Sequence, residues 1–249
     1  MTGGGANGIC LLDLGNTRYK WVARDRLESD APLKRRYAGQ DAAAALCRDV
    51  LARSECRRWL VASVRSASFN RELERRFLEA GGESIRFVAI PDEPPFRLAY
   101  RDTDRFGIDR YLNLLAARSA YPLPAIVIDV GTAVTADALD SHGDHVGGMI
   151  FPGLALLRRA LGQGTDLVGE AAATARSPLG ASTEACVAAG IHHGFAGALL
   201  TMVDSLGQVL GRRATIVVTG GDADEVAAAL RDHSPIVDTR LLFTGMTRT

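Results

Sequence analysis

The sequence contains only four cysteines, and their spacing excludes the two structural roles that cysteines most often have. None of them forms a C-x-x-C pair, and no histidine stands at metal-ligand spacing from them. In a chain of 249 residues this pattern is typical of reduced thiols in a cytosolic protein, not of a disulfide framework or a zinc site. Cys10 lies within an apolar segment, so we expect it in the core.

Net charge, long apolar runs and a secretory leader are also missing. Lysine plus arginine and aspartate plus glutamate number 29 each, which argues against nucleic acid as the main partner. No run approaches the ~18 consecutive apolar residues of a membrane span. The first eight residues are polar and rich in glycine, unlike a signal peptide. We therefore expect a cytoplasmic protein with no membrane partner.

One motif occurs twice along the chain. The sequence reads LLDLGNTRYK over residues 11–20 and IVIDVGTAVT over residues 126–135. Each copy is a short apolar strand, an aspartate, a glycine two residues later, and then hydroxyl or amide side chains. The strand carries the carboxylate of Asp13 or Asp129 to its own end, and the glycine allows a tight turn close to a ligand.

Turns of this kind are suited to phosphate. Backbone N–H groups and Thr or Asn side chains hold phosphate oxygens, so two copies facing each other across a cleft would clamp a nucleotide triphosphate and its metal. We expect Asp13 to hold Mg²⁺ through water, because Mg²⁺ gives up its water reluctantly. Lys20 would neutralise phosphate if its strand points it into the cleft; a solvated strand residue is the alternative. The spacing of a P-loop does not occur.

The order of predicted elements favours an α/β protein with two halves. In each half antiparallel strands precede alternating helices and strands, which suits a mixed sheet covered by helices. The segment Tyr121–Pro124 closes the first half, so we expect domains at residues 1–122 and 123–249.

Strands are expected at residues 9–14, 19–23, 34–37, 59–64, 85–90, 125–130, 132–139, 146–151 and 214–219. Helices are expected at residues 41–53, 69–80, 108–120, 153–162, about 183–206 and 222–231, followed by a last strand or short helix.

A turn between the two motifs places a carboxylate beside a guanidinium. In Phe106-Gly107-Ile108-Asp109-Arg110 both groups lie in the first turn of a predicted helix. The helix dipole alone favours an aspartate there. A kinase that acts on an alcohol, however, needs a base near the attacking hydroxyl and cationic groups over the transferred phosphoryl group. Asp109 and Arg110 would supply both.

Other polar clusters are expected to be solvated surface. The segment Lys34–Arg36 is a small basic cluster, and His142 and His145 flank a predicted turn.

Taken in order, these motifs resemble the type III pantothenate kinases of the acetate kinase, sugar kinase, Hsp70 and actin superfamily. The resemblance extends from about Ile9 to about Thr244. It implies two duplicated ribonuclease H-like, or actin-like ATPase, domains with mixed sheets flanked by helices. The motifs that carry it are Asp13-Leu-Gly-Asn-Thr-x-x-Lys20, Gly107-x-Asp109-Arg110, Ile128-Asp129-x-Gly131-Thr132-Ala133-x-Thr135 and Gly147-Gly148-x-Ile150-x-Pro152-Gly153.

The resemblance also implies roles for individual residues. Asp109 matches the catalytic base for the pantothenate hydroxyl, and Asp129 matches the ligand of a monovalent cation, K⁺ or NH₄⁺. Residues implied in binding ATP and Mg²⁺ are Asp13, Leu14, Gly15, Asn16, Thr17, Arg18, Tyr19, Lys20 and Thr132. Residues implied in binding pantothenate are Tyr100, Gly107, Ile108, Asp109, Arg110 and Thr183. The segment Thr219–Asp222 stands where the superfamily packs adenosine.

The implied activity is phosphorylation of pantothenate by ATP to 4′-phosphopantothenate, the first step toward coenzyme A, in a homodimer. Thr183 would then reach the neighbouring subunit's pocket. Phe106 and Ser182 depart from the commoner Leu and Asn, which affects the pocket wall and the Thr183 assignment. Two alternatives stay open: a sugar or acetate kinase of the same superfamily, and a non-catalytic transcription regulator of the same fold. The presence of Asp13, Asp109 and Asp129 favours an enzyme.

Overall fold

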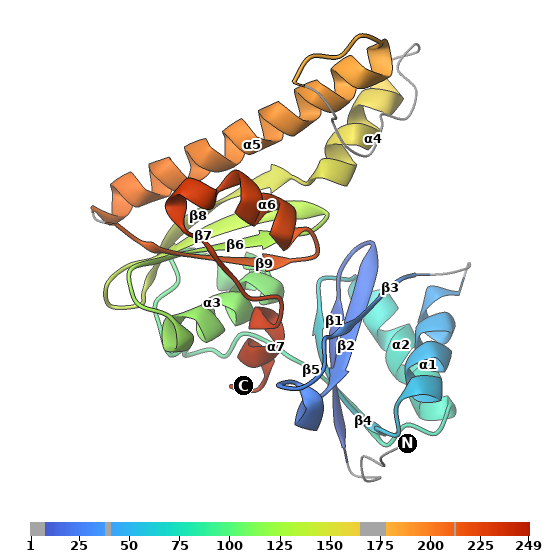
Figure 1. Ribbon diagram of the computed structural model, residues 1–249. Coiled ribbons are helices and arrows are strands. Elements are labelled where there is room, and N and C mark those ends of the chain that lie inside the picture. Colours follow the sequence, from blue (N-terminus) through green and yellow to red (C-terminus); the bar gives the residue numbers. More distant parts are fainter. Residues whose placement is uncertain (1–7, 38–40, 165–177, 212) are drawn as a thin grey trace. The chain divides into compact units, whose positions relative to one another are not determined.

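The chain folds into two compact units. The computed structural model describes residues 8–37, 41–164, 178–211 and 213–249 (Figure 1). Unit 1 comprises Met1–Pro95, Tyr100–Ala116 and Arg240–Thr249. Unit 2 comprises Phe96–Ala99 and Ala117–Thr239.

Unit 1 is built on a five-stranded sheet of order β3-β2-β1-β4-β5. The strand pairs β1–β2 and β2–β3 are antiparallel, whereas β1–β4 and β4–β5 are parallel. The sheet is therefore mixed, as the sequence predicted. Its strands are β1 (Ile9–Leu14), β2 (Arg18–Ala23), β3 (Leu33–Arg36), β4 (Arg58–Ser63) and β5 (Ser84–Phe87).

Two helices of unit 1, α1 (Ala42–Arg53) and α2 (Ala67–Glu79), bury the apolar face of this sheet. Asp41 caps α1 by accepting a hydrogen bond from the N–H of Ala44 at 3.0 Å, as expected for a helix that begins there. Ser66 caps α2 in the same way, so this helix begins two residues earlier than expected. The core between sheet and helices includes Leu12, Trp21, Trp59, Leu46 and Phe77.

Unit 1 also contains α7 (Leu241–Met246) and residues up to Ala116 of α3 (Ile108–Ala120). Helix α7 lies against β1. A Cβ on Gly245 of α7 would collide with the backbone of Leu112, so glycine permits the close approach of α7 and α3. Short 3₁₀ turns occur at Arg24–Arg26 and Thr103–Arg105.

Unit 2 repeats the sheet of unit 1. Its strand order, β10-β9-β6-β7-β8, is that of unit 1 written in reverse, and the corresponding pairs have the same directions. Asp13 is the fifth residue of β1, and Asp129 is the fifth residue of β6, so the motif repeat coincides with a structural repeat. The strands are β6 (Ala125–Val130), β7 (Ala133–Leu139), β8 (His145–Pro152), β9 (Thr215–Gly220) and β10 (Ile236–Val237).

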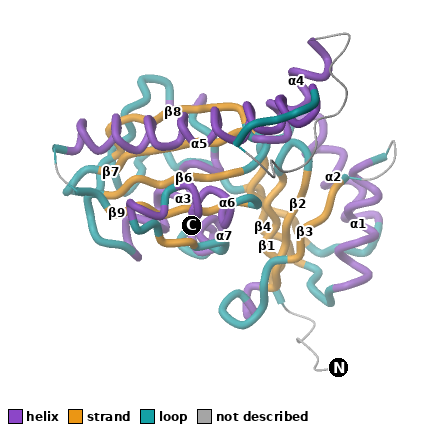
Figure 2. The backbone as a smooth tube through the Cα atoms, turned by 45° about the horizontal axis from the view of Figure 1, so that its top comes forward, coloured by secondary structure: helices purple, strands orange, loops and turns teal. Residues whose placement is uncertain are grey.

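The core helix of unit 2 is α5 (Thr183–Leu210), which runs along the sheet and contacts β6 and β7 (Figure 2). Its buried residues, Phe195, Leu199 and Val203 among them, pack on Ile126 and Ile128. The remaining helices of unit 2 are α4 (Leu154–Gly164) and α6 (Ala223–Ala229), with a 3₁₀ turn at Arg231–His233.

Judged by length and composition alone, helix α5 is long and apolar enough to cross a membrane. Its most apolar window has a mean hydropathy of 1.5, and 39% of that window is buried. Core helices of globular proteins meet the same criterion, and the buried residues of α5 pack on the sheet of unit 2.

The structure overturns the expectation that His145 is a surface residue. His145 is 1% exposed, and its Nε2 lies 3.0 Å from Oδ1 of Asp137, which is also buried. The N–H of Ala99 donates to Nδ1 of His145 at 3.4 Å, and the N–H of His145 donates to the carbonyl of Arg97 at 2.9 Å. The short segment Phe96–Ala99 is thereby attached to unit 2, whereas His142 is exposed as expected.

Candidate functional site

The first Asp-x-Gly turn places Asp13 and Lys20 on one face of the unit 1 sheet. The two residues are directly opposite in the β1–β2 register, so their side chains share a face. Lys20 Nζ lies 3.7 Å from Asp13 Oδ2, and both side chains are partly exposed. Strand geometry thus directs the ammonium toward the carboxylate that the sequence singled out.

Tyr19 points the other way. Its side chain is buried against α1, and its hydroxyl donates to Asp49 Oδ2 at 2.8 Å. Burial raises the pKa of Tyr19, and the hydrogen bond to Asp49 raises it further. Leu14 is also fully buried. These two residues can offer a ligand only their backbone groups.

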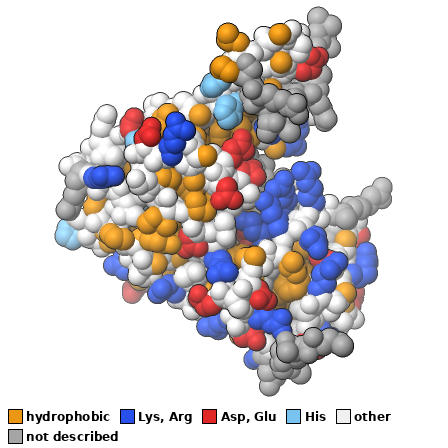
Figure 3. Space-filling view, in the orientation of Figure 1, with side chains coloured by type: hydrophobic (Ala, Val, Ile, Leu, Met, Phe, Trp, Pro, Cys, Tyr) orange, Lys and Arg blue, Asp and Glu red, His pale blue; other side chains and the backbone are white. Residues whose placement is uncertain are grey.

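Cations gather on the same face as Asp13. In the β2–β3 register Arg18 is opposite Arg36 and Lys20 is opposite Lys34, and Figure 3 shows lysine and arginine side chains clustered in this region. Like charges directly opposite one another are destabilising in a sheet, so a bound anion would relieve their repulsion. The basic cluster Lys34–Arg36 is largely exposed, as expected, and Lys34 and Arg36 in addition extend the cationic face of the first motif.

Side chains distant in sequence hold the turn itself. The Tyr37 hydroxyl donates to the carbonyl oxygen of Gly15 at 3.0 Å, and Arg65 Nη1 donates to the carbonyl oxygen of Asn16 at 2.9 Å. A Cβ on Gly15 would lie 3.0 Å from the carbonyl oxygen of Arg18, which explains the glycine. Sequence reasoning missed Tyr37 and Arg65 because nothing in the local pattern links them to the turn.

The turn before α3 assembles an aromatic and cationic cluster in unit 1. Arg110 is 5% exposed and donates from Nη1 to the Tyr100 hydroxyl at 2.8 Å. Its guanidinium carbon lies 4.4 Å from the ring centroid of Phe106, and the rings of Tyr100 and Phe106 meet edge to face at 4.8 Å. The structure thus brings together three residues that the sequence placed in one pocket.

Asp109 occupies the first turn of α3, as expected. Its Oδ1 accepts a hydrogen bond from the N–H of Arg110 at 2.8 Å. A Cβ on Gly107 would lie 2.5 Å from this oxygen, so Gly107 leaves room for the carboxylate to fold back over the helix start. This hydrogen bond agrees with a role in stabilising the first turn of α3. It also keeps the Asp109 carboxylate near Arg110, which contacts Tyr100 and Phe106.

The second Asp-x-Gly turn has a different environment. Asp129 is opposite Thr135 on β7 and Thr219 on β9, so hydroxyl groups occupy the positions held by Lys20 and Ala62 around Asp13. The two motifs therefore have the same backbone arrangement, but the side chains around their aspartates differ in charge.

Three glycine turns of unit 2 converge at the end of β6. The N–H of Gly153 donates to the carbonyl of Thr132 at 3.0 Å, and the N–H of Gly221 donates to that of Val130 at 2.8 Å. Gly220 has a φ of 102°, and a Cβ there would lie 2.6 Å from Asp129 Oδ1. The segment predicted to pack adenosine thus lies beside Asp129.

Thr183 is the first residue of α5 and is exposed. Ser182, the departure noted in the sequence, is the N-cap of this helix and accepts from the N–H of Ala185 at 3.2 Å. Serine therefore fulfils a capping role that Asn also fulfils well.

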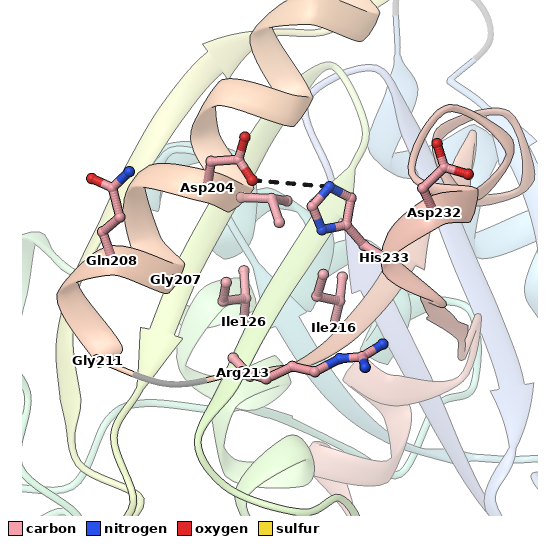
Figure 4. Close-up of a pocket in the computed structure, with 11 residues that line it drawn as sticks. Ile126, Asp204, Gly207, Gln208, Gly211, Arg213, Ile216, Asp232 and His233 are labelled. Atoms are coloured by element: carbon pink, nitrogen blue, oxygen red, sulfur yellow. Dashed lines mark ion pairs between the residues drawn. The ribbon is translucent and has the colours of Figure 1, made fainter.

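A pocket of about 670 Å³ lies elsewhere in unit 2 (Figure 4). Ile126 and Ile216 form its apolar wall near the starts of β6 and β9, and His233 Nε2 lies 3.9 Å from Asp204 Oδ1 at its rim. None of the residues predicted from the sequence lines it. Asp129 and Thr219 lie toward the opposite ends of the same strands.

The donor groups fit a metal that is shared with a substrate. In the part of the chain that the structure describes, no three His, Cys, Asp or Glu side chains are grouped as metal ligands. Mg²⁺ is usually held by one or two carboxylates together with substrate phosphates. The lone carboxylate of Asp13 on a cationic face fits that arrangement.

The duplicated sheets define the class of protein. The structure is similar to a Campylobacter jejuni protein described as a conserved putative Baf family transcriptional activator, with a TM-score of 0.61, 19% identity and 96% coverage of both chains. It is also similar to MreB5 of Spiroplasma citri bound to ADP, with a TM-score of 0.51, 12% identity and coverage of 97% and 95%. The fold is that of the actin-like ATPases.

Sequence comparison then identifies the family. The family model for type III pantothenate kinase matches residues 9–205. The type III pantothenate kinase of Halorhodospira halophila is 34% identical over 226 residues, covering 88% of this chain and 89% of that protein. The chain belongs to the type III pantothenate kinase family.

Proposed function

We propose that this protein phosphorylates pantothenate with ATP to give 4′-phosphopantothenate, the first step of coenzyme A biosynthesis. The observation that carries the proposal is the family match over residues 9–205, a region that contains Asp13, Asp109 and Asp129. The halves 1–122 and 123–249 would each contribute one Asp-x-Gly turn, and the enzyme would act in the cytoplasm.

In this proposal the first motif binds the ATP phosphates. The cationic face with Arg18 and Lys20 supports this role, because it offers an anion several partners. Asn16 and Thr17 would contribute turn N–H groups, Leu14, Gly15 and Tyr19 would contribute backbone, and Thr132 would be a further ATP contact.

We propose a different metal ion for each Asp-x-Gly turn, because the two aspartates have different neighbours. Asp13 would hold Mg²⁺, which neutralises phosphate charge when bound. Asp129 would be the ligand of K⁺ or NH₄⁺, and the neutral hydroxyls of Thr135 and Thr219 on either side support a weakly charged ion there.

The pantothenate site would be built on the turn before α3. Tyr100, Gly107, Ile108 and Arg110 would line it, and Thr183 would reach it from the second subunit of a homodimer. The burial of the Arg110 guanidinium against the rings of Tyr100 and Phe106 supports this role, because a cation fixed in this way binds an anionic group without losing side-chain freedom.

Asp109 would orient the pantothenate hydroxyl and accept its proton as the phosphoryl group moves. Arg110 would offset negative charge on the reacting groups. Phosphoryl transfer needs little covalent chemistry from the protein, so positioning and electrostatic stabilisation provide most of the acceleration.

The test measures ADP release by the wild type and by Asp109→Asn in the presence of ATP, Mg²⁺ and pantothenate. Each protein is assayed once in K⁺ and once in Na⁺. We expect pantothenate-dependent turnover that is higher in K⁺. The substitution should lower turnover by about 10²-fold or more, because a positioned base contributes 10²–10⁴-fold, and ATP binding should change little. An Asp109→Asn enzyme that keeps most of its turnover would refute the base assignment.

Two other functions are separated by the same assay. A sugar or acetate kinase of this superfamily would release ADP with its own acceptor and not with pantothenate. A non-catalytic regulator would release none with any acceptor, and the likeness to the Campylobacter jejuni protein described as a putative transcriptional activator is the observation that keeps this alternative in view.

A further inference from the structure

We infer that Arg65 and Tyr37 are positioning residues for the first Asp-x-Gly turn: they fix the two peptide groups after Gly15 and Asn16 in the orientation that binds ATP phosphates. The inference rests on the proposed function of that turn. It adds two residues from outside the motif, each attached to the turn by a hydrogen bond.

The argument begins with the two carbonyl groups of the turn. A carbonyl oxygen directed at a phosphate would repel it, whereas an N–H would attract it. Tyr37 donates to the oxygen of Gly15 at 3.0 Å, and Arg65 donates to the oxygen of Asn16 at 2.9 Å. Both oxygens are therefore held against unit 1 side chains.

Peptide geometry then fixes the N–H groups. In a planar trans peptide the C=O and the following N–H point in opposite directions. With the oxygens of Gly15 and Asn16 directed at Tyr37 and Arg65, the N–H groups of Asn16 and Thr17 point away from those side chains. Successive N–H groups in a turn form the concave arrangement that binds anions.

Arg65 is itself held in place. Its guanidinium carbon lies 4.8 Å from the ring centroid of Tyr37 and 4.3 Å from that of Phe69. The same two rings meet edge to face at 5.8 Å. A planar guanidinium stacks on aromatic rings in a way that a lysine ammonium does not.

The backbone beside Arg65 is anchored to the end of β1 through Val64. The N–H of Val64 donates to the carbonyl of Leu14 at 3.1 Å, and the N–H of Arg65 donates to Ser63 Oγ at 3.2 Å. Ser63 Oγ in turn bonds Asn70 of α2 at 2.7 Å. The segment between β4 and α2 thus connects the turn to the rigid part of unit 1, which pre-organises it.

The experiment measures ATP affinity by calorimetry, and KM for ATP and for pantothenate, in Arg65→Met, Arg65→Lys and Tyr37→Phe. Arg71→Met, an exposed arginine on α2, is the matched control. Lys20→Met reports whether the turn binds ATP at all. Urea unfolding checks that each variant is folded. If Arg65→Met does not fold, Tyr37→Phe still tests the inference, because it removes only a hydroxyl group and keeps both aromatic rings in place.

We expect Arg65→Met to weaken ATP binding about tenfold, because hydrogen bonds that involve a charged group are the stronger ones. Tyr37→Phe removes one neutral hydrogen bond and should weaken it about threefold to fivefold. The KM for pantothenate should stay within about twofold in both, and Arg65→Lys should recover little, since lysine restores the charge but not the planar fork.

The outcomes separate the two levels of the proposal. If Lys20→Met weakens ATP binding and the Arg65 and Tyr37 variants do not, the positioning role is wrong and the phosphate-binding turn stands. If Lys20→Met also has no effect, the assignment of the turn to ATP fails. Full recovery by Arg65→Lys with no effect of Tyr37→Phe would instead make Arg65 a direct charge contact and overturn the inference.

Discussion

At the scale of single residues, the aspartates at equivalent positions of the two motifs have different neighbours. Asp13 is opposite a lysine, whereas Asp129 is between two threonines and next to Gly220. A carboxylate beside an ammonium on a cationic face suits a site shared with phosphate, and a carboxylate among hydroxyls suits a single positive ion. Identical motif letters thus give two chemically different sites, because cross-strand partners set the local charge.

His145→Ala should destabilise the protein strongly. The substitution leaves the buried Asp137 carboxylate without the imidazole, and breaking a buried pair from one side costs about 3–5 kcal/mol. The measurement is the free energy of unfolding in urea, with the exposed His142→Ala as control. A loss for His145→Ala no greater than that for His142→Ala would show that the buried Asp137 carboxylate does not depend on the imidazole.

At the scale of elements, the strand-end turns depend on glycines that tertiary contacts require. Gly153 lies against the Gly131–Thr132 backbone, where a Cβ would collide with the Gly131 oxygen. Gly220 combines a positive φ with a similarly close approach to Val130. The sequence located these turns from Gly and Asp spacing, but the convergence of three of them at the end of β6 follows from the order in which the strands pair.

Gly220→Ala should destabilise unit 2 by at least about 2 kcal/mol, since a non-glycine residue in such a conformation costs about 1–3 kcal/mol before any clash. Gly207→Ala, within α5 and with open space around it, should instead stabilise by about 0.5–1 kcal/mol. Urea unfolding measures both. Equal effects of the two substitutions would contradict the requirement for glycine at the end of β9.

At the scale of the whole molecule, two copies of one sheet topology form the chain, and α5 is the longest of its described helices. The Asp-x-Gly repeat in the sequence predicted this duplication, and the two mixed sheets confirm it. The helix boundaries agree with expectation within a few residues, because capping residues such as Asp41 are local signals. The burial of His145 and the hydrogen bond from Arg65 to the first Asp-x-Gly turn could not be predicted, since both depend on contacts between distant segments.

The proposed homodimer makes a test of subunit exchange possible. Thr183→Ala and Asp109→Asn should each be poorly active alone. If Thr183 serves the partner's pocket, mixing the two variants creates heterodimers with one intact site, and about a quarter of the sites should become active in a random equimolar mixture. The measurements are light scattering for the dimer and ADP release before and after subunit exchange. A confirmed dimer that gains no activity on exchange would place Thr183 in the pocket of its own subunit.

The sequence by itself determined the two strand-end aspartates, the glycine turns after them, the alternation of helices and strands, and the family, because these depend on residue type and spacing along the chain. Only the tertiary structure decided which side chain faces each aspartate, that Lys34 and Arg36 extend a cationic face, and that Arg65 and Tyr37 hold the first turn. Strand register and long-range hydrogen bonds set these contacts, and both are properties of the packed sheet that no local pattern encodes.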